Sequence, residues 1–380
     1  MKIALVSPYD WAYPGGVANH IEQMSKEFKR NGHSVTVIAP SSKSALELGT
    51  PGLVTIGRPI PLPTGGSIAR ITLSFHRGGQ VRDALERGNF DVIHVHEPLV
   101  SALPLTVLRY STSVNVATFH AYRFHSREYM SLRPLLVRWF RRLHGKIAVS
   151  KPAADMVSKY FPGYYNIIPN GIDTAHFSAQ VEPIERFKDG KVNILFVGRM
   201  EKRKGLQYLL AAYARMKWEY PNTRLIVVGP GKMDAASERI LGERALKDVE
   251  FMGPATYAEL PRYYRTADIF CSPATGAESF GIVLLEAMAS GTAVVASNIP
   301  GYATVVKDGA QGLLVEPKND QALADALITL ANSAHLRRDM GLRGRAHAMD
   351  FSWEKVASRV MEYYRRLLET RAPGRLLREE

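Results

Sequence analysis

Short apolar runs alternate with helical patterns along the chain. In the first half the strand-like runs are KIALVSP, HSVTVIAP, DVIHVHEP, SVNVATFH and GKIAVS. Between the first two, apolar residues recur at helical spacing from Val17 to Phe28, and Asn31-Gly32 provides a stop signal. This alternation predicts a parallel sheet whose strands are joined by crossover helices.

The pattern pauses around Pro169-Asn170-Gly171 and then starts again. The second set of apolar runs is NILFVGR, LIVVGPG, VEFMG, ADIFCSPA, TAVVAS and GLLVEP, with helices expected over Leu206 to Trp218 and Ile282 to Ala289. A chain of 380 residues also exceeds what one core usually supports. We therefore predict an α/β protein with two doubly wound, Rossmann-like domains. The expected divisions are a domain over 1–172, a linker over 173–190, a domain over 191–350, a helix over 351–370 capped by Ser352 and a tail over 371–380.

Composition and charge narrow the setting of the protein. No stretch approaches the roughly 20 apolar residues of a membrane span, and the first residues lack the pattern of a secretory signal. Cys271 is the single cysteine, which fits a reducing compartment, so we expect a cytoplasmic protein. The net charge of +13 calls for an anionic partner, and residues 123–146 hold seven basic residues against one acid.

A glycine-rich loop follows the first predicted strand. Pro14-Gly15-Gly16 opens the helix that begins at Val17, so unobstructed amides lie at a helix N-terminus, where anions bind. A diphosphate suits this position. A plain tight turn is an equally good interpretation of these residues alone.

A second loop at a strand end carries fixed cations. In GRMEKRKG, Arg199 and Lys204 flank the turn that leads into the next helix near Gly205. Two cations beside a helix start can hold a diphosphate and stabilise it as it leaves. The alternative is a solvated basic loop, which is less usual directly after an apolar strand.

Two carboxylates bracket the start of an apolar helix in AESFGIVLLEAM. Glu278 lies in the loop and Glu286 lies about one turn inside the helix, among apolar neighbours where an acid is costly unless it is hydrogen-bonded. Ribose hydroxyls can supply those bonds to Glu286. Glu278 can accept from sugar hydroxyls, and the free amides from Phe280 to Ile282 can contact the sugar or phosphate.

Three histidines end or line strands in the first half. His120 ends ATFH at the ligand-binding edge of the sheet and is either a sugar contact or a satisfied core histidine. His94 and His96 alternate on one strand face, but no third ligand is suggested nearby and the chain has no Asp-x-Asp pair. We expect no essential metal and no cofactor besides a nucleotide diphosphate sugar as substrate.

The order of these motifs resembles that of the retaining glycosyltransferases of family 4, which have the GT-B fold. The matching segments are SPYDWAYPGGV, GGSIAR, HVHEP, ATFH, IAVS, IPNGID, AESFGIVLLEAM and GTAVVAS. The resemblance implies two Rossmann-like domains that face each other across a cleft, the first binding the acceptor and the second the nucleotide sugar, with the C-terminal helix returning to the first. It further implies donor contacts by Gly16, Arg199, Lys204, Glu278, Phe280, Gly281, Ile282 and Glu286, catalytic roles for His120, Arg199, Lys204 and Glu278, and acceptor contacts by Tyr9, Arg70 and His120.

The acceptor and the membrane depend on weaker matches. The motifs are nearest to family members that move mannose from GDP-mannose to a phosphatidylinositol-like lipid, but Leu99 replaces an asparagine of that group and the segment AYRFHSREYM differs from theirs. The acceptor is therefore a lipid-linked or polyol phosphate. A predicted helix with an apolar stripe lies among the arginines of residues 123–146, and it either lies on anionic lipid or packs on the core. The stripe is made of Leu135, Leu136, Trp139, Phe140 and Leu143. We expect a peripheral protein of the inner membrane face.

Three alternatives stay open at this point. Glucosyl or N-acetylglucosaminyl transfer to another acceptor fits the same motifs. A nucleotide-sugar 2-epimerase shares the double-Rossmann design, but the donor-side pattern of Glu278 and Glu286 argues against it. A nucleic-acid binder is suggested by charge alone and would need basic residues interleaved with exposed aromatics. We expect no nucleic-acid partner.

Overall fold

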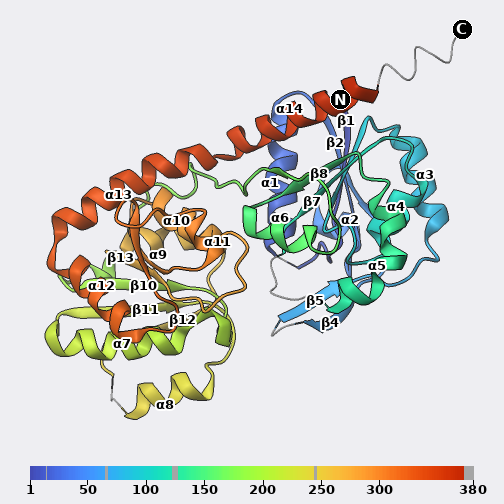
Figure 1. Ribbon diagram of the computed structural model, residues 1–380. Coiled ribbons are helices and arrows are strands. Elements are labelled where there is room, and N and C mark those ends of the chain that lie inside the picture. The colour runs from blue at the N-terminus through green and yellow to red at the C-terminus, as the bar shows by residue number, and fades with distance from the viewer. Residues whose placement is uncertain (14, 65–66, 122–126, 244–245, 372–380) are drawn as a thin grey trace, which may run out of the picture. The chain divides into compact units, whose positions relative to one another are not determined.

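The chain folds into two compact units in the computed structural model (Figure 1). The structure describes residues 1–13, 15–64, 67–121, 127–243 and 246–371. Unit 1 comprises Met1–Gly171 and Trp353–Glu380, and unit 2 comprises Ile172–Ser352. The chain thus leaves unit 1 after Gly171 and returns to it at Trp353.

Unit 1 is a parallel α/β layer structure. Its described elements are β1 (Lys2–Val6), α1 (Gly16–Arg30), β2 (Ser34–Ala39), α2 (Ala45–Leu48), β3 (Leu53–Thr55), β4 (Ile60–Thr64), β5 (Ser67–Ile71), α3 (Gly78–Gly88), β6 (Val92–His96), α4 (Ala102–Tyr110), β7 (Val114–Phe119), α5 (Arg127–Phe140), β8 (Gly145–Ala148), α6 (Lys151–Ser158), β9 (Asn166–Ile167) and α14 (Trp353–Arg371). Within the described residues, a seven-stranded sheet has the order β3-β2-β1-β6-β7-β8-β9, and β4 and β5 form a separate antiparallel pair.

Burial explains why unit 1 adopts these layers. Along β1, residues Ile3 to Val6 are fully buried, and their side chains alternate between one core on each face of the sheet. The apolar stripe of α1 covers one face. There the C-terminal helix α14 joins it, since the Tyr364 ring packs edge-on against Phe28. The C-terminal helix therefore returns to the N-terminal unit, as the sequence predicted.

Unit 2 repeats the design. Its described elements are η1 (Glu185–Phe187), β10 (Val192–Val197), η2 (Lys202–Lys204), α7 (Leu206–Glu219), β11 (Thr223–Val228), α8 (Ala235–Glu243), β12 (Val249–Gly253), α9 (Leu260–Thr266), β13 (Ile269–Ser272), α10 (Ile282–Ala289), β14 (Ala293–Ser297), α11 (Pro300–Ala303), β15 (Gly312–Val315), α12 (Asp320–Asn332), α13 (Ala334–Ala348) and η3 (Met349–Phe351). The described strands form a parallel sheet of order β12-β11-β10-β13-β14-β15 with a core on each face. Two Rossmann-like units confirm the predicted fold class.

Each sheet contains a reversal point, where the strand order changes from one side of the first strand to the other. In unit 1 it lies between β1 and β6, and in unit 2 between β10 and β13. Crossover helices leave to opposite faces at such a point, and the loops beyond the carboxyl ends of these strands open a crevice for ligands. The loops after these four strands hold most of the residues singled out by the sequence.

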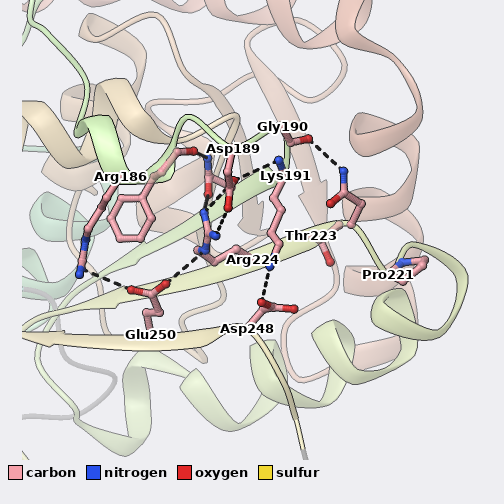
Figure 2. A network of polar contacts seen from close by, with 12 residues as sticks. Arg186, Asp189, Gly190, Lys191, Pro221, Thr223, Arg224, Asp248 and Glu250 are labelled. Carbon is pink, nitrogen blue, oxygen red and sulfur yellow. Dashed lines mark hydrogen bonds and ion pairs between the residues drawn. The ribbon is translucent and has the colours of Figure 1, made fainter.

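The opposite end of the unit 2 sheet is held by a network of ion pairs. Figure 2 shows Arg224, at the start of β11, between Asp189 and Glu250. Lys191 reaches Asp248, just before β12, at 2.5 Å. These bonds connect the amino ends of the neighbouring strands β10, β11 and β12.

Two segments, the stripe on α5 and residues 173–190, contribute side chains to the cores. Of the stripe on α5, Leu136, Trp139 and Phe140 are buried in the unit 1 core, as is Leu143 just beyond the helix, so the core interpretation is right and the lipid-facing interpretation of these four residues is wrong. Residues 173–190, expected as a linker, lie in unit 2, where Phe177 and Phe187 belong to the core.

Candidate active site

The loops after β10 and β13 approach each other closely in unit 2. Gly205 has a φ of 76°, and a Cβ placed on it would lie 2.0 Å from the carbonyl oxygen of Pro273. The backbone amide of Thr275 donates to the carbonyl oxygen of Arg203 at 2.8 Å. Only glycine permits this packing at position 205, so the sequence KG at the end of GRMEKRKG brings the cationic loop against the loop that carries Glu278.

A chain of ion pairs fills the space between these loops. One oxygen of Glu278 accepts from Arg203 Nη1 at 2.5 Å and from Lys204 Nζ at 2.7 Å. Glu201 joins Arg203 at 2.8 Å to Arg199 at 3.0 Å. Lys204 and Glu278 are therefore in direct contact, whereas Arg199 belongs to the same cluster through Glu201.

Glu286 lies buried on α10, where a tyrosine from a neighbouring helix reaches it. The hydroxyl of Tyr264 donates to its Oε2 at 2.6 Å. Burial raises the pKa of the Glu286 carboxyl to about 7, and the Tyr264 bond and the charge of Lys204 only partly offset this rise. The cost of the buried acid, inferred from its apolar neighbours, is thus met in part by a tyrosine from α9.

The N-terminus of α10 presents its amides between the two carboxylates. Gly281 precedes the helix with a φ of 110°, and no side chain caps it. The Phe280 ring is buried in the core of unit 2, so of this residue only the backbone is left for a ligand. An uncapped helix start of this kind attracts the negative charge of a phosphate or the hydroxyl oxygens of a sugar.

In unit 1 the corresponding loop follows β1. Helix α1 begins at Gly16, and Gly15 precedes it with extended backbone and no side-chain cap. Pro14, the first residue of the predicted glycine loop, lies outside the described residues. The helix start again offers free amides to an anion.

A cluster of four histidines lies at the carboxyl edge of the unit 1 sheet. His20 comes from the second turn of α1, and the others, His94, His96 and His120, come from β6 and the end of β7. His96 Nδ1 lies 3.0 Å from His120 Nε2, and His20 Nδ1 lies 3.0 Å from the side-chain oxygen of Asn170. Burial lowers the pKa of His20 to about 4 and places those of His96 and His120 well below 6.5, so the rings are neutral. His94 is stacked on His96 and is bonded by Tyr364 and Thr118.

The cluster brings together three side chains that are able to bind a metal ion. Nitrogen atoms of His20, His96 and His120 lie within 4.8 Å of one another, and they form the only such group found among the described residues. The sequence suggested no third ligand beside His96, because His20 and His120 are distant in the chain. Each of these rings also takes part in a hydrogen bond, with another ring of the cluster or with Asn170.

Glu97, next to His96, holds the backbone at the end of β7. Its Oε1 accepts from the amides of His120 at 2.6 Å and Ala121 at 2.7 Å. Glu97 itself has a φ of 46°, which is unusual for a residue with a side chain. This strained residue places His120 at the edge of the sheet.

Tyr9 and Arg70, the predicted acceptor contacts, come together in unit 1. Tyr9 forms a backbone bridge with Ile71, and the next amide, of Asp10, donates to the carbonyl oxygen of Arg70 at 2.9 Å. The guanidinium of Arg70 lies over the Tyr13 ring at 3.9 Å. An arginine beside two tyrosines suits a phosphate-bearing polar group.

Several residues of the two sites were not singled out by the sequence. Arg203 lies within the basic loop, but it is not one of the two cations that flank the loop. Tyr264, His20 and Asn170 carry no local signal, because each reaches the site from a distant segment. Only packing reveals them.

Two Rossmann-like units with glycine-led helix starts at both reversal points, one beside a cluster of cations and carboxylates, are typical of a glycosyltransferase of the GT-B type. The chain belongs to the glycosyltransferases of group 1 and family 4: residues 179–347 match the family of glycosyl transferases group 1, and residues 14–176 match glycosyltransferase family 4. It is 36% identical over 370 residues to the phosphatidyl-myo-inositol mannosyltransferase of Mycobacterium tuberculosis, covering 96% of both chains. Enzymes of group 1 use nucleotide sugars as donors.

Solved structures share the fold. A glycosyltransferase from Rickettsia africae superimposes with a TM-score of 0.80 at 18% identity, covering 96% of this chain and 98% of that one. The Anabaena protein HepE, in complex with UDP and glucose, gives a TM-score of 0.72 at 19% identity, with 96% and 99% covered. Among the described residues, no helix is both long and apolar enough to cross a bilayer.

Proposed function

We propose that this enzyme transfers mannose from GDP-mannose, with retention of configuration, to a phosphatidylinositol-like lipid at the inner face of a membrane. The observation that carries the proposal is the Arg203–Glu278–Lys204 cluster beside the uncapped start of α10. The likeness to phosphatidyl-myo-inositol mannosyltransferases supports the choice of sugar and acceptor.

The cluster supplies what departure of a nucleoside diphosphate requires. As the bond between the sugar C1 and the phosphate oxygen breaks, the sugar becomes oxocarbenium-like and negative charge builds on the phosphate. Arg199 and Lys204 stabilise that charge in the place of a divalent cation. The acceptor oxygen bonds to C1 on the same face, and its proton passes to the leaving phosphate oxygen, so no protein nucleophile takes part.

The remaining residues of unit 2 orient the donor. Glu278 must release at least part of its bonding to Arg203 and Lys204 to accept from sugar hydroxyls. The Glu286 oxygens accept from the ribose hydroxyls. The amides of Gly281 and Ile282 contact the sugar or its phosphate.

Unit 1 supplies the other half of the proposal. Gly16, at the start of α1, holds the diphosphate. His120 contacts the transferred sugar from the edge of the sheet, next to the acceptor.

Product analysis tests the donor and acceptor directly. We expect label from GDP-mannose to appear in phosphatidylinositol, with the α-linkage of the donor conserved. Calorimetry with GDP, UDP and ADP gives the base preference, with GDP binding most tightly. Tighter UDP binding together with transfer from UDP-glucose would replace mannosyl by glucosyl transfer, and no transfer to any lipid would remove the acceptor assignment.

Exposed apolar residues of unit 1 support the membrane part of the proposal. Ile68, on the β4–β5 pair, exposes 61% of its surface, and Phe75, shortly after it, exposes 54%. On α5 the exposed apolar residues include Met130, Leu132 and Leu135, so Leu135 is the one member of the stripe that is exposed. Arg70 lies on the same strand as Ile68. Apolar side chains beside arginines are typical of surfaces that insert into the interface of anionic lipid.

Vesicle flotation tests this surface. We expect the enzyme to float with vesicles that contain anionic lipid at low salt, and Ile68→Glu with Phe75→Glu to reduce the bound fraction severalfold. Leu46→Glu is the matched control, because Leu46 is 92% exposed on α2. Equal flotation of all three proteins would place the lipid contact elsewhere.

A further inference from the structure

The His120 ring is held by two neighbours from different segments of unit 1. His96, at the end of β6, bonds its Nε2, and a side-chain bond with Asn170 acts on the same ring. Asn170 stands directly before Gly171, the last residue before the chain passes into unit 2. The partners of this ring therefore belong to the sheet and to the departing chain.

Chemistry decides which way the bond between His96 and His120 points. Each neutral ring has one N–H donor and one bare nitrogen. If His120 Nε2 donated, the proton of His96 would lie on Nε2, which is buried and has no hydrogen-bond partner among the described residues. A buried N–H without a partner is costlier than a buried bare acceptor. His96 Nδ1 is therefore the donor and His120 Nε2 the acceptor.

The same argument then applies to Asn170. With Nε2 accepting, the proton of His120 lies on Nδ1, the ring nitrogen that remains for the Asn170 oxygen. That oxygen has two lone pairs, and His20 Nδ1 donates to it as well at 3.0 Å. The Asn170 oxygen then faces the N–H groups of two rings, and all three histidines have a single consistent pattern of protons.

We propose that His96 and Asn170 are positioning residues for His120, which they hold as the neutral tautomer protonated on Nδ1, with its lone pair on Nε2. The inference rests on the proposed role of His120 beside the transferred sugar. A sugar hydroxyl that approaches this ring can donate to His120 Nε2, and its hydrogen bond then replaces the one from His96.

The residue that follows Asn170 is closely packed as well. A Cβ on the next residue, Gly171, would lie 2.4 Å from the Trp353 ring, and Trp353 also packs edge-on against His20 at 5.0 Å. Both passages of the chain out of and into unit 1 thus touch the histidine cluster. The backbone just after Asn170 is therefore closely packed beside the cluster.

Nitrogen NMR of the full-length enzyme with labelled histidine tests the tautomer without relying on activity. Signals of His120 are assigned by their loss in His120→Gln. We expect the proton on Nδ1 and a bare Nε2 at neutral pH. A proton on Nε2 would overturn the proposal even in a fully active enzyme, and the predicted pattern in an enzyme that transfers no mannose would overturn only the proposed function.

Asn170→Asp provides a readout that a purely structural role would not change. The titratable groups around the ring are His20, His94, His96 and Glu97. A carboxylate at position 170 favours protonated imidazole, so the ring pKa rises and the acid limb of the kcat profile moves to higher pH, by about one to three units.

Asn115→Asp is the matched control for this substitution. Asn115 is also buried and lies near the opposite end of β7 from His120. We expect it to lower stability but leave the acid limb in place. An unshifted limb in folded Asn170→Asp, or the same shift in both variants, would contradict the positioning role. If Asn170→Asp does not fold, the wild-type NMR spectrum still decides.

Discussion

Two ion-pair networks lie at opposite ends of the unit 2 sheet. They are built from the same types of side chain but have different roles. At the amino ends of the strands, Asp248 accepts from Lys191 at 2.5 Å and Lys217 at 2.7 Å, and these bonds lower its pKa to about 2. At the carboxyl ends, Glu278 also accepts from two cations, yet nearby Glu286 is buried with its pKa raised to about 7. The network at the amino ends of the strands holds the strands together. The network at the reversal point lies where we propose that the ligand binds.

Lys204→Ala should have the largest effect. It removes a cation that we propose stabilises the leaving diphosphate, so we expect kcat/KM for sugar transfer to fall about 100-fold or more with the fold intact. Lys202→Ala is the matched control, because Lys202 is exposed in the same loop. Similar rates for both variants, measured by product formation, would show that the loop is only a solvated basic turn.

Arg203→Gln sharpens the assignment of the residue that sequence reasoning missed. Arg203 orients Glu278 and links it to Glu201. Loss of one charged partner should lower kcat/KM about 30-fold, which corresponds to ~2 kcal/mol. In a double-mutant cycle with Glu278→Gln the two effects should not add, and strict additivity would separate Arg203 from Glu278.

Glu286→Gln tests the buried carboxylate through pH. Because the pKa of Glu286 is about 7, its carboxylate fraction grows as pH rises from 6 to 8. If only the anion accepts from the ribose hydroxyls, GDP should bind about tenfold more tightly at pH 8 than at pH 6. Calorimetry should show this slope in the wild type and not in Glu286→Gln. An unchanged slope in the variant would assign the dependence to another group.

Asp248→Asn should have the smallest effect. Asparagine tolerates the φ of 57° at this position but loses the charge that Lys191 and Lys217 share. We expect the free energy of unfolding at pH 7 to fall by ~1 kcal/mol and transfer rates to stay unchanged. Since the folded pKa lies below the unfolded value, this stabilisation is present above about pH 4 and lost toward pH 2. Thermal melts at several pH values measure it, and a reduced transfer rate would blur the contrast between the two networks.

The fold was predictable because its signals are local and repeated. Apolar runs of strand length, separated by helical spacing, indicated both sheets, and α10 spans Ile282–Ala289 as expected. The ends of strands also pointed to the loops of Arg199 and Glu278, because parallel strands all end at one edge. These inferences need only neighbours in the sequence.

The rest depended on contacts between distant segments. The stripe of Leu136, Trp139 and Phe140 could face lipid or core on periodicity alone, and only the packing of α5 shows that it faces the core. Likewise nothing near Glu286 in the sequence announces Tyr264, which lies 22 positions before it. Asn170 reaches His20 across 150 positions.

The most direct test of the central claim, that the carboxyl edge of the unit 2 sheet holds a nucleoside diphosphate, is calorimetric titration of GDP into wild-type enzyme, Lys204→Ala and Asp248→Asn side by side. The account predicts one site, with affinity reduced at least tenfold in Lys204→Ala and unchanged in Asp248→Asn. Equal GDP affinity in wild type and Lys204→Ala would contradict it.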